Sequence, residues 1–257
     1  MIRAIVYTVV FIVIQLLTSL TVTQALQLAG VDIEQQGATL LIVTQTAASV
    51  ATIALFLYLR WTEVSRRYLL MRPWDVFFWC CIAALGTLIP STFLQEQMPE
   101  LPNFVEEQLD MILRDRWGYF AIGLLAPICE EIVFRGAVLR VLLRWTSRHW
   151  LAIAVSALLF ALVHANPAQM PHAFLVGLLL GWLYYRTDSI LPGIVIHWVN
   201  NSAAYVVYNL YPDPAIKLID ILGSQRQVVA AVIFSLFILL PALYQLHLRL
   251  KKAVGDE

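Results

Sequence analysis

The amino-acid sequence predicts an all-α membrane protein, a polytopic bundle of about eight transmembrane helices. The first reason is composition, since 60% of the 257 residues are apolar and only 13% are charged, whereas soluble domains average roughly 45–50% and about 25%. The second reason is that the apolar residues gather in long runs, and about 20 of them in a helix cross the bilayer core. A water-soluble globule is therefore excluded.

Eight apolar runs follow one another along the chain and are the candidate spans. They are Ala4–Leu26, Thr39–Leu59, Trp74–Leu94, Tyr119–Leu143, Trp150–Ala165, Ala173–Tyr185, Ile190–Leu210 and Val228–Leu246. The first is too long for the apolar stretch of a cleaved signal peptide, so we expect an uncleaved span. The fifth and sixth are short, so the alternative is six spans with a re-entrant hairpin. Because the connections are mostly short, residues 1–257 are expected to form a single integral-membrane domain.

Basic residues are divided unequally between the two sides of these spans. The richer side holds 12 of the 17, namely Arg3, Arg60, Arg66, Arg67, Arg72, Arg140, Arg144, Arg148, Arg186, Arg249, Lys251 and Lys252. The other side holds Arg114, Arg116, Lys217 and Arg226, and many acidic residues, Glu34 and Glu100 among them. The positive-inside rule places both termini in the cytoplasm of a multi-pass cell-membrane protein. The 17 acidic residues balance the 17 basic ones, so no overall charge attracts nucleic acid.

Two segments carry signals for packing rather than for spanning. The outer segment Gln95–Trp117 has apolar residues at helical spacing opposed by acidic residues, which is typical either of a helix lying in the membrane interface or of an acidic surface loop. In the sixth run, Ala173, Gly177 and Gly181 form a ladder of small residues. Such a ladder lets a neighbouring helix approach closely.

Ionisable residues at membrane depth are costly and indicate function. Glu130 and Glu131 are the two acidic residues that lie deep within an apolar run, and Arg135 follows in the same run. Glu131 and Arg135 are four residues apart, so they share a helix face and are predicted to pair. Glu130 faces about 100° away and is left free for chemistry. The structural alternative is a buried salt bridge that only fixes helix register, and Pro127 is expected to kink the helix beside it.

Two later runs supply further polar side chains. Phe160 and His164 stand four residues apart at the end of the fifth run, and His197 and Asn201 have the same spacing in the seventh. That spacing directs both members of each pair to one helix face. At a rise of about 1.5 Å per residue, these residues can share one intramembrane layer with Glu130.

The three motifs resemble those of a known family. Glu130-Glu131-x-x-x-Arg135, Phe160-x-x-x-His164 and His197-x-x-x-Asn201 are similar, in order and without departure, to the motifs of the CAAX-protease and bacteriocin-processing (CPBP or ABI) intramembrane proteases, which include the Ras-converting prenyl-protein endopeptidases. The resemblance covers about 118–210, the expected protease core. It implies an intramembrane endopeptidase with its active site inside the membrane.

The resemblance also implies roles for the motif residues. Glu130 would activate a water as general base, with His164 sharing its proton traffic. His197 and Asn201 would form the oxyanion site, and Glu131 would hold the first carboxylate in place. Arg135 and Phe160 would support the site. Catalysis then requires no cofactor, or alternatively uses a divalent metal such as zinc bound by Glu130, His164 and His197.

Other classes of function also suit intramembrane charges. A proton-coupled membrane transporter is one alternative, although such carriers often show internal repeats and we find no convincing one. A non-catalytic immunity or scaffold membrane protein is another. The resemblance implies a membrane-anchored protein or peptide as substrate, and the short chain resembles the bacterial relatives, so the expected partners are that substrate and the lipid bilayer of a bacterial plasma membrane.

Overall fold

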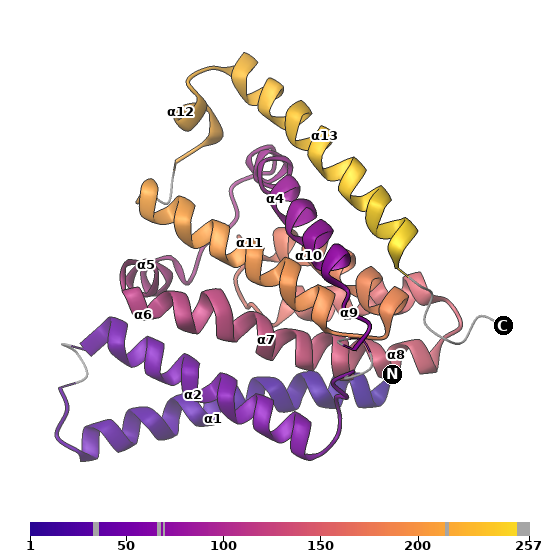
Figure 1. Cartoon of the computed structure of the whole chain (residues 1–257). Coiled ribbons are helices and arrows are strands. Elements are labelled where there is room, and N and C mark those ends of the chain that lie inside the picture. The colour runs from indigo at the N-terminus through magenta and orange to yellow at the C-terminus, as the bar shows by residue number, and fades with distance from the viewer. Residues whose placement is uncertain (33–35, 66–67, 69, 214–215, 251–257) are drawn as a thin grey trace.

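A computed structural model describes residues 1–32, 36–65, 68, 70–213 and 216–250. Five charged residues used in the sidedness argument lie outside the described residues, and these are Glu34, Arg66, Arg67, Lys251 and Lys252. Within the described ranges the chain forms helices joined by turns and contains no β-strand (Figure 1). The prediction of an all-α fold is therefore confirmed.

Each of the eight predicted apolar runs lies mostly in helix, but the fifth leaves it after Leu162, so that His164 stands in the turn that follows α9 (His149–Leu162). The helices are α1 (Ile2–Leu28), α2 (Gly37–Tyr58), α4 (Trp74–Glu96), α5 (Glu106–Arg114), α6 (Arg116–Gly118), η2 (Tyr119–Leu125), α7 (Ala126–Glu131), η3 (Ile132–Leu139), α8 (Arg140–Trp145), α9 (His149–Leu162), α10 (Met170–Thr187), α11 (Leu191–Leu210), α12 (Leu218–Leu222) and α13 (Gln225–Arg249). The α1–α2 pair and the α4–α13 pair lie on opposite sides of the helices that carry the three motifs (Figure 1).

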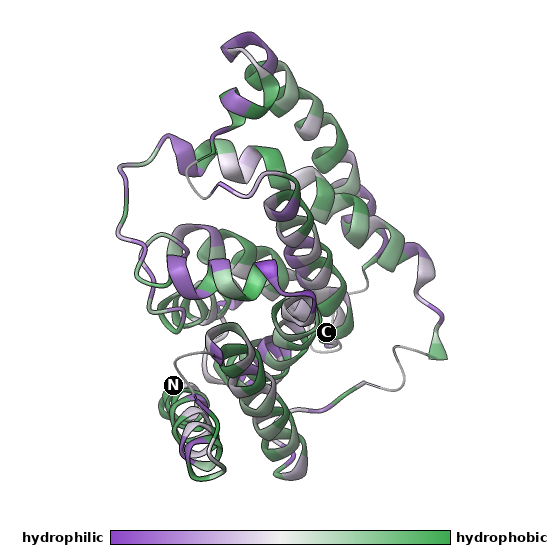
Figure 2. Cartoon of the chain, turned by 90° about the vertical axis from the view of Figure 1, so that its left-hand side faces the viewer, coloured by the Kyte–Doolittle hydropathy of each residue, from purple (hydrophilic) through white to green (hydrophobic). Residues whose placement is uncertain are grey.

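Four of the described helices, α1, α2, α4 and α13, are long and apolar enough to cross a membrane. Hydrophobic residues make up much of the helical ribbon (Figure 2), and many large apolar side chains are exposed, such as Leu16 at 60% and Phe237 at 73%. Exposed apolar surface on this scale is stable in lipid rather than in water. The chain is therefore a membrane protein.

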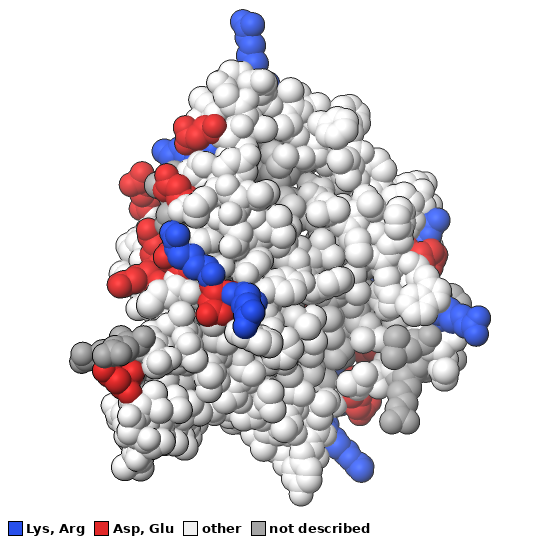
Figure 3. Space-filling model, turned by 60° about the vertical axis from the view of Figure 1, so that its left-hand side comes forward, with Lys and Arg blue, Asp and Glu red and all other residues white. Residues whose placement is uncertain are grey.

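Charged side chains gather at the edges of the molecule, with a broad uncharged surface between them (Figure 3). Charged residues from the predicted cytoplasmic side form ion pairs with one another. Arg140 pairs with Glu63 at 2.6 Å, and Arg249 pairs with Asp75 at 3.1 Å. The outer segment includes the helix α5, which packs against α2 and α11. Its acidic residues Glu106 and Glu107 are exposed while Leu113 is buried.

Residues 116–145 form one continuous helix, here called the site helix, which includes two π-helical stretches, η2 and η3. A π-helical turn is wider than an α-turn and often occurs at functional sites. We expected Pro127 to kink this helix, and the structure places it at the start of α7, directly after the η2 stretch. One π-helical stretch thus ends just before the proline, and the other begins directly after the glutamate pair.

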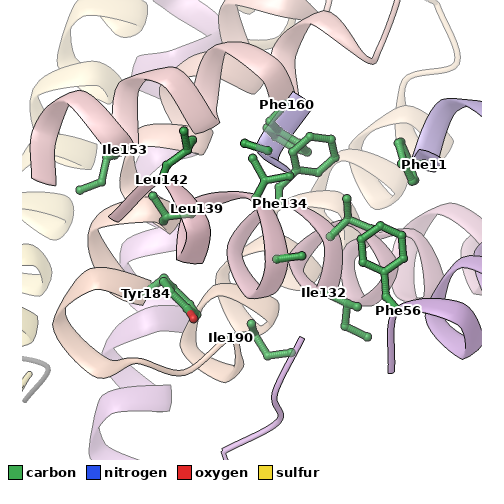
Figure 4. Close-up of a cluster of buried hydrophobic side chains, with 14 of the residues drawn as sticks. Phe11, Phe56, Ile132, Phe134, Leu139, Leu142, Ile153, Phe160, Tyr184 and Ile190 are labelled. Carbon is green, nitrogen blue, oxygen red and sulfur yellow. The ribbon is translucent and has the colours of Figure 1, made fainter. Parts of the chain in front are cut away.

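The small-residue ladder of α10 packs against α9, as predicted. A Cβ added to Gly177 would lie 3.0 Å from the Cβ of Ala157, and one added to Gly181 would lie 2.8 Å from Cγ2 of Ile153. The close approach of α9 and α10 brings Phe160 into the main apolar cluster beside Phe134 (Figure 4). This packed apolar cluster lies directly beside the polar residues.

Candidate functional site

The buried ion pair between Glu131 and Arg135 forms the base of the site. Arg135 Nη1 donates to Glu131 Oε1 at 2.8 Å, and the two side chains are 1% and 0% exposed. Arg135 also donates to the Gly177 carbonyl at 3.3 Å and lies over the Phe160 ring, 4.5 Å from its centroid. A buried guanidinium needs such partners because an unpaired charge away from water is costly. The predicted pairing of Glu131 with Arg135 is therefore formed.

Close packing of α11 leaves little space around Glu131. A Cβ on Gly193 would lie only 2.6 Å from Glu131 Oε2, so a larger side chain at this position would displace the carboxylate. The same oxygen is buried and has no hydrogen-bond partner among the described residues. Glycine at 193 thus allows α11 to carry His197 up to the glutamate pair.

His197 lies between the two glutamates. Its Nδ1 is 3.1 Å from Glu131 Oε1, and its Nε2 is 3.6 Å from Glu130 Oε2, which is longer than a direct hydrogen bond. The Glu130 side chain is 19% exposed, whereas that of Glu131 is fully buried. The two neighbouring carboxylates thus have different surroundings, because one is held by Arg135 and His197 while the other remains accessible.

His164 belongs to the same cluster through aromatic contacts. Its Nδ1 is 2.9 Å from the Phe160 carbonyl, an acceptor, so Nδ1 carries the proton and Nε2 is free to accept. The Phe160 ring meets His164 and His197 edge-on, with centroids 5.0 Å and 5.7 Å away. Among the described contacts His164 has no ion pair with Glu130, whereas His197 Nε2 lies 3.6 Å from Glu130 Oε2.

Asn201 is held by the site helix. Its Nδ2 donates to the Ile122 carbonyl at 3.0 Å. In η2 the backbone follows the π register, in which Ala126 N–H bonds to the Ala121 carbonyl five residues earlier. The next donor in that register would come from residue 127, which is a proline and has no N–H. Pro127 thus leaves the Ile122 carbonyl free to accept from Asn201.

Two polar residues of the site were missed in the sequence. Asn200 Nδ2 lies 3.3 Å from His172 Nε2 and 3.4 Å from Asn201 Oδ1. The His172 ring is within electrostatic range of His164 and His197. The sequence did contain a signal, because His172 directly precedes the apolar run taken to begin at Ala173. Asn200 was not singled out, because its neighbour Asn201 is the residue that completes the His-x-x-x-Asn spacing.

We tested whether the proposed zinc ligands fit a metal ion. Among the described residues, no group of three His, Cys, Asp or Glu side chains could hold one. Glu130, His164 and His197 therefore do not form such a group in this arrangement.

An apolar groove of about 690 Å³ lies elsewhere, between α2 and the outer end of the site helix. Its walls include Ile42, Val50, Trp117 and Phe120, and none of the motif residues lines it. The groove is therefore distinct from the polar cluster.

The fold and the polar cluster together define a class, a helical membrane protein with Glu, Arg and His side chains gathered from the site helix, the end of α9 and α11. Residues 113–203 match the family model described as type II CAAX prenyl endopeptidase Rce1-like. This is the family that the three motifs resembled, and the matched segment includes all three. The match supports a CAAX-protease-like endopeptidase in general. No curated protein and no solved structure matches the chain.

Proposed function

We propose that this protein is an intramembrane endopeptidase that hydrolyses a peptide bond in membrane-anchored proteins or peptides through a water activated by glutamate and histidine. The observation that carries the proposal is the contrast between the two glutamates. Glu131 is fully buried and paired, whereas Glu130 is accessible and faces His197 Nε2 at 3.6 Å. An accessible carboxylate beside a histidine suits a general base.

In the proposed reaction, Glu130 takes a proton from water while the water oxygen attacks the scissile carbonyl carbon. The carbonyl oxygen becomes an oxyanion in a tetrahedral intermediate. When the intermediate collapses, the C–N bond breaks and the proton held by Glu130 passes to the leaving amine. His164 Nε2, which is free to accept, can relay this proton.

The oxyanion needs donors that are already in place before charge develops. An asparagine amide has two N–H donors, and Asn201 uses one of them on the Ile122 carbonyl. The second N–H is available to the oxyanion. His197 can be the other donor if Nε2 carries a proton.

Glu131 and Arg135 would hold His197 rather than react. Their hydrogen bonds orient the imidazole through Nδ1, and α10 supports Arg135 through the Gly177 carbonyl. A site built on packed helices keeps its groups at fixed distances, which catalysis requires.

The proposed setting is a bundle of eight spans with the polar cluster inside the membrane. The site helix, α9, α10 and α11 would complete the bundle alongside the four long apolar helices. The excess of Arg and Lys near one side supports cytoplasmic termini. The proposed location is a bacterial plasma membrane.

The test is cleavage of a panel of membrane-anchored peptides by purified protein in liposomes. Wild type should cleave at least one peptide and Glu130→Gln none. Glu107→Gln is the matched control, since this exposed glutamate on α5 lies outside the cluster and should leave cleavage unchanged. Proton-coupled uptake without cleavage would overturn the proposal in favour of a transporter.

A further inference from the structure

A short relay of hydrogen bonds links α10 to the proposed oxyanion donor on α11. Asn200 Nδ2 lies 3.3 Å from His172 Nε2 and 3.4 Å from Asn201 Oδ1. Asn201 Nδ2 continues the relay to the Ile122 carbonyl at 3.0 Å. The site helix, α10 and α11 thus meet through two adjacent amides.

The chemistry of the amide group fixes the direction of each bond. An amide nitrogen can only donate, so His172 Nε2 accepts and the proton of this neutral imidazole is on Nδ1. Asn200 thereby commits its two N–H groups, one to His172 and one to Asn201 Oδ1. Because Asn201 Oδ1 is the acceptor, its Nδ2 must face the other way, toward the site helix.

The opposite side of the Asn201 amide is fixed by the backbone. The Ile122 carbonyl takes one N–H of Asn201, because Pro127 cannot supply the backbone donor that the π register would place there. Asn201 is therefore held from both sides, which leaves one N–H with a defined direction.

Burial of Asn200 in this place costs folding free energy. It is 7% exposed, and its Oδ1 is buried without a hydrogen-bond partner among the described residues. A buried unpaired amide oxygen opposes folding, whereas an apolar side chain of similar size would avoid that cost. A group kept against stability is more simply explained by a role in the site than by packing.

We propose that Asn200 and His172 are positioning residues that set the orientation of the Asn201 amide, so that its free N–H points at the oxyanion. The proposal rests on the peptidase function proposed above. It deepens that function by adding two residues that touch neither the water nor the scissile bond.

The experiment is a double-mutant cycle measured as kcat and KM on a cleaved peptide. Asn200→Leu should lower kcat on the order of 10- to 100-fold, as expected when a catalytic group is displaced by less than an ångström. KM should change little, because the oxyanion forms only in the transition state. In an Asn201→Ala background, Asn200→Leu should have no further effect. A merely structural role would lower activity equally in both backgrounds.

Variants of His172 test the other end of the relay. His172→Phe keeps an aromatic ring but removes the acceptor and should lower kcat, whereas His172→Gln offers an acceptor oxygen and should recover part of it. Asn209→Leu is the matched control on α11, since Asn209 binds the Leu113 and Tyr205 carbonyls away from the site. Should Asn200→Leu fail to fold, the isosteric Asn200→Asp replaces it, because it cannot donate to His172 and Asn201 together.

The outcomes separate this inference from the proposed function. If wild type cleaves, Glu130→Gln does not, and Asn200→Leu retains the wild-type kcat, then the relay is overturned while the peptidase function stands. If Asn200→Leu lowers kcat by the same factor with and without Asn201, the relay is also overturned. Absence of cleavage by wild type on the whole panel would overturn both.

Discussion

At the residue scale, two adjacent glutamates are assigned different tasks by their surroundings. Glu131 is enclosed by Arg135, His197 and the backbone at Gly193, whereas the ion pair of Glu130 among the described residues is the 3.6 Å contact to His197 Nε2. Removing a carboxylate from a buried ion pair leaves the partner charge uncompensated. Removing the accessible carboxylate leaves no such charge behind.

The two glutamates should therefore respond differently to the same substitution. Glu130→Gln should abolish cleavage with little change in stability, while Glu131→Gln and Arg135→Ala should lower the free energy of unfolding by about 3–5 kcal/mol. Denaturation in detergent, followed by tryptophan fluorescence, measures the stability of each variant. If Glu130→Gln stayed active while Glu131→Gln folded normally but was inactive, the two roles would have to be exchanged.

Substitution of Asn201 should change the rate of catalysis rather than the binding of substrate. Asn201→Ala should lower kcat by about 10²- to 10³-fold, the usual loss for one oxyanion donor. KM should stay close to that of wild type, because charge develops only in the transition state. Steady-state cleavage of one peptide measures both constants, and an increase in KM at unchanged kcat would assign Asn201 to substrate binding.

At the element scale, the site helix is held by side chains that reach its π-helical stretches. Thr62 Oγ1 donates to the Ile132 carbonyl at 2.6 Å, and Ser156 Oγ donates to the Phe134 carbonyl at 3.0 Å. Thr62 also occupies the space beside Gly136, where an added Cβ would lie 2.1 Å from Thr62 Cγ2. Thr62, which follows α2 in the chain, thereby joins this segment to the helix that carries both glutamates.

A pair of substitutions tests this contact. Gly136→Ala should lower stability by about 1–3 kcal/mol, the usual cost of overpacking. In a Thr62→Ala background the same change should cost clearly less, because the methyl and hydroxyl groups nearest to the new Cβ are gone. Thermal unfolding of the four proteins measures the coupling, and an equal penalty in both backgrounds would show that Thr62 is not the obstacle.

The helices could be predicted from the sequence because most apolar runs are long and all are bounded by polar residues. Pairing of Glu131 with Arg135 followed equally simply from their spacing of four. The π-helical stretches could not be predicted, since Pro127 indicated only a disturbed helix and the partners of the freed carbonyls come from remote segments. His172 and Asn200 escaped for the same reason, as their contact joins α10 to α11 and depends on how these helices pack.

At the scale of the whole molecule, the two ends of the bundle differ in the charged residues that they carry. Arg140 holds Glu63 at one end and lowers the pKa of its carboxyl through a hydrogen bond and charge attraction. This pair stabilises the fold above the ordinary pKa of glutamate and loses its effect as pH falls through the lowered value. Because the Glu63 side chain is 73% exposed, the contribution is small.

The orientation of the bundle can be measured by labelling. A cysteine at Glu100 should react with an impermeant thiol reagent in intact cells, whereas one at Arg148 should react only after the membrane is opened. Both positions are exposed. The parent chain is the control, because Cys80 and Cys129 are buried and Cys81 is partly buried. The reverse pattern of labelling would contradict cytoplasmic termini.

The central claim is that glutamate and histidine activate the water without a metal. It is tested most directly by single-turnover cleavage with metal analysis of the same samples, for wild type and His197→Gln. We predict cleavage by wild type that a chelator does not reduce, no stoichiometric metal, and partial activity in His197→Gln, whose amide can still donate to the oxyanion. Stoichiometric zinc that disappears together with activity in His197→Gln, and activity that returns to chelated wild type when zinc is added, would contradict the claim.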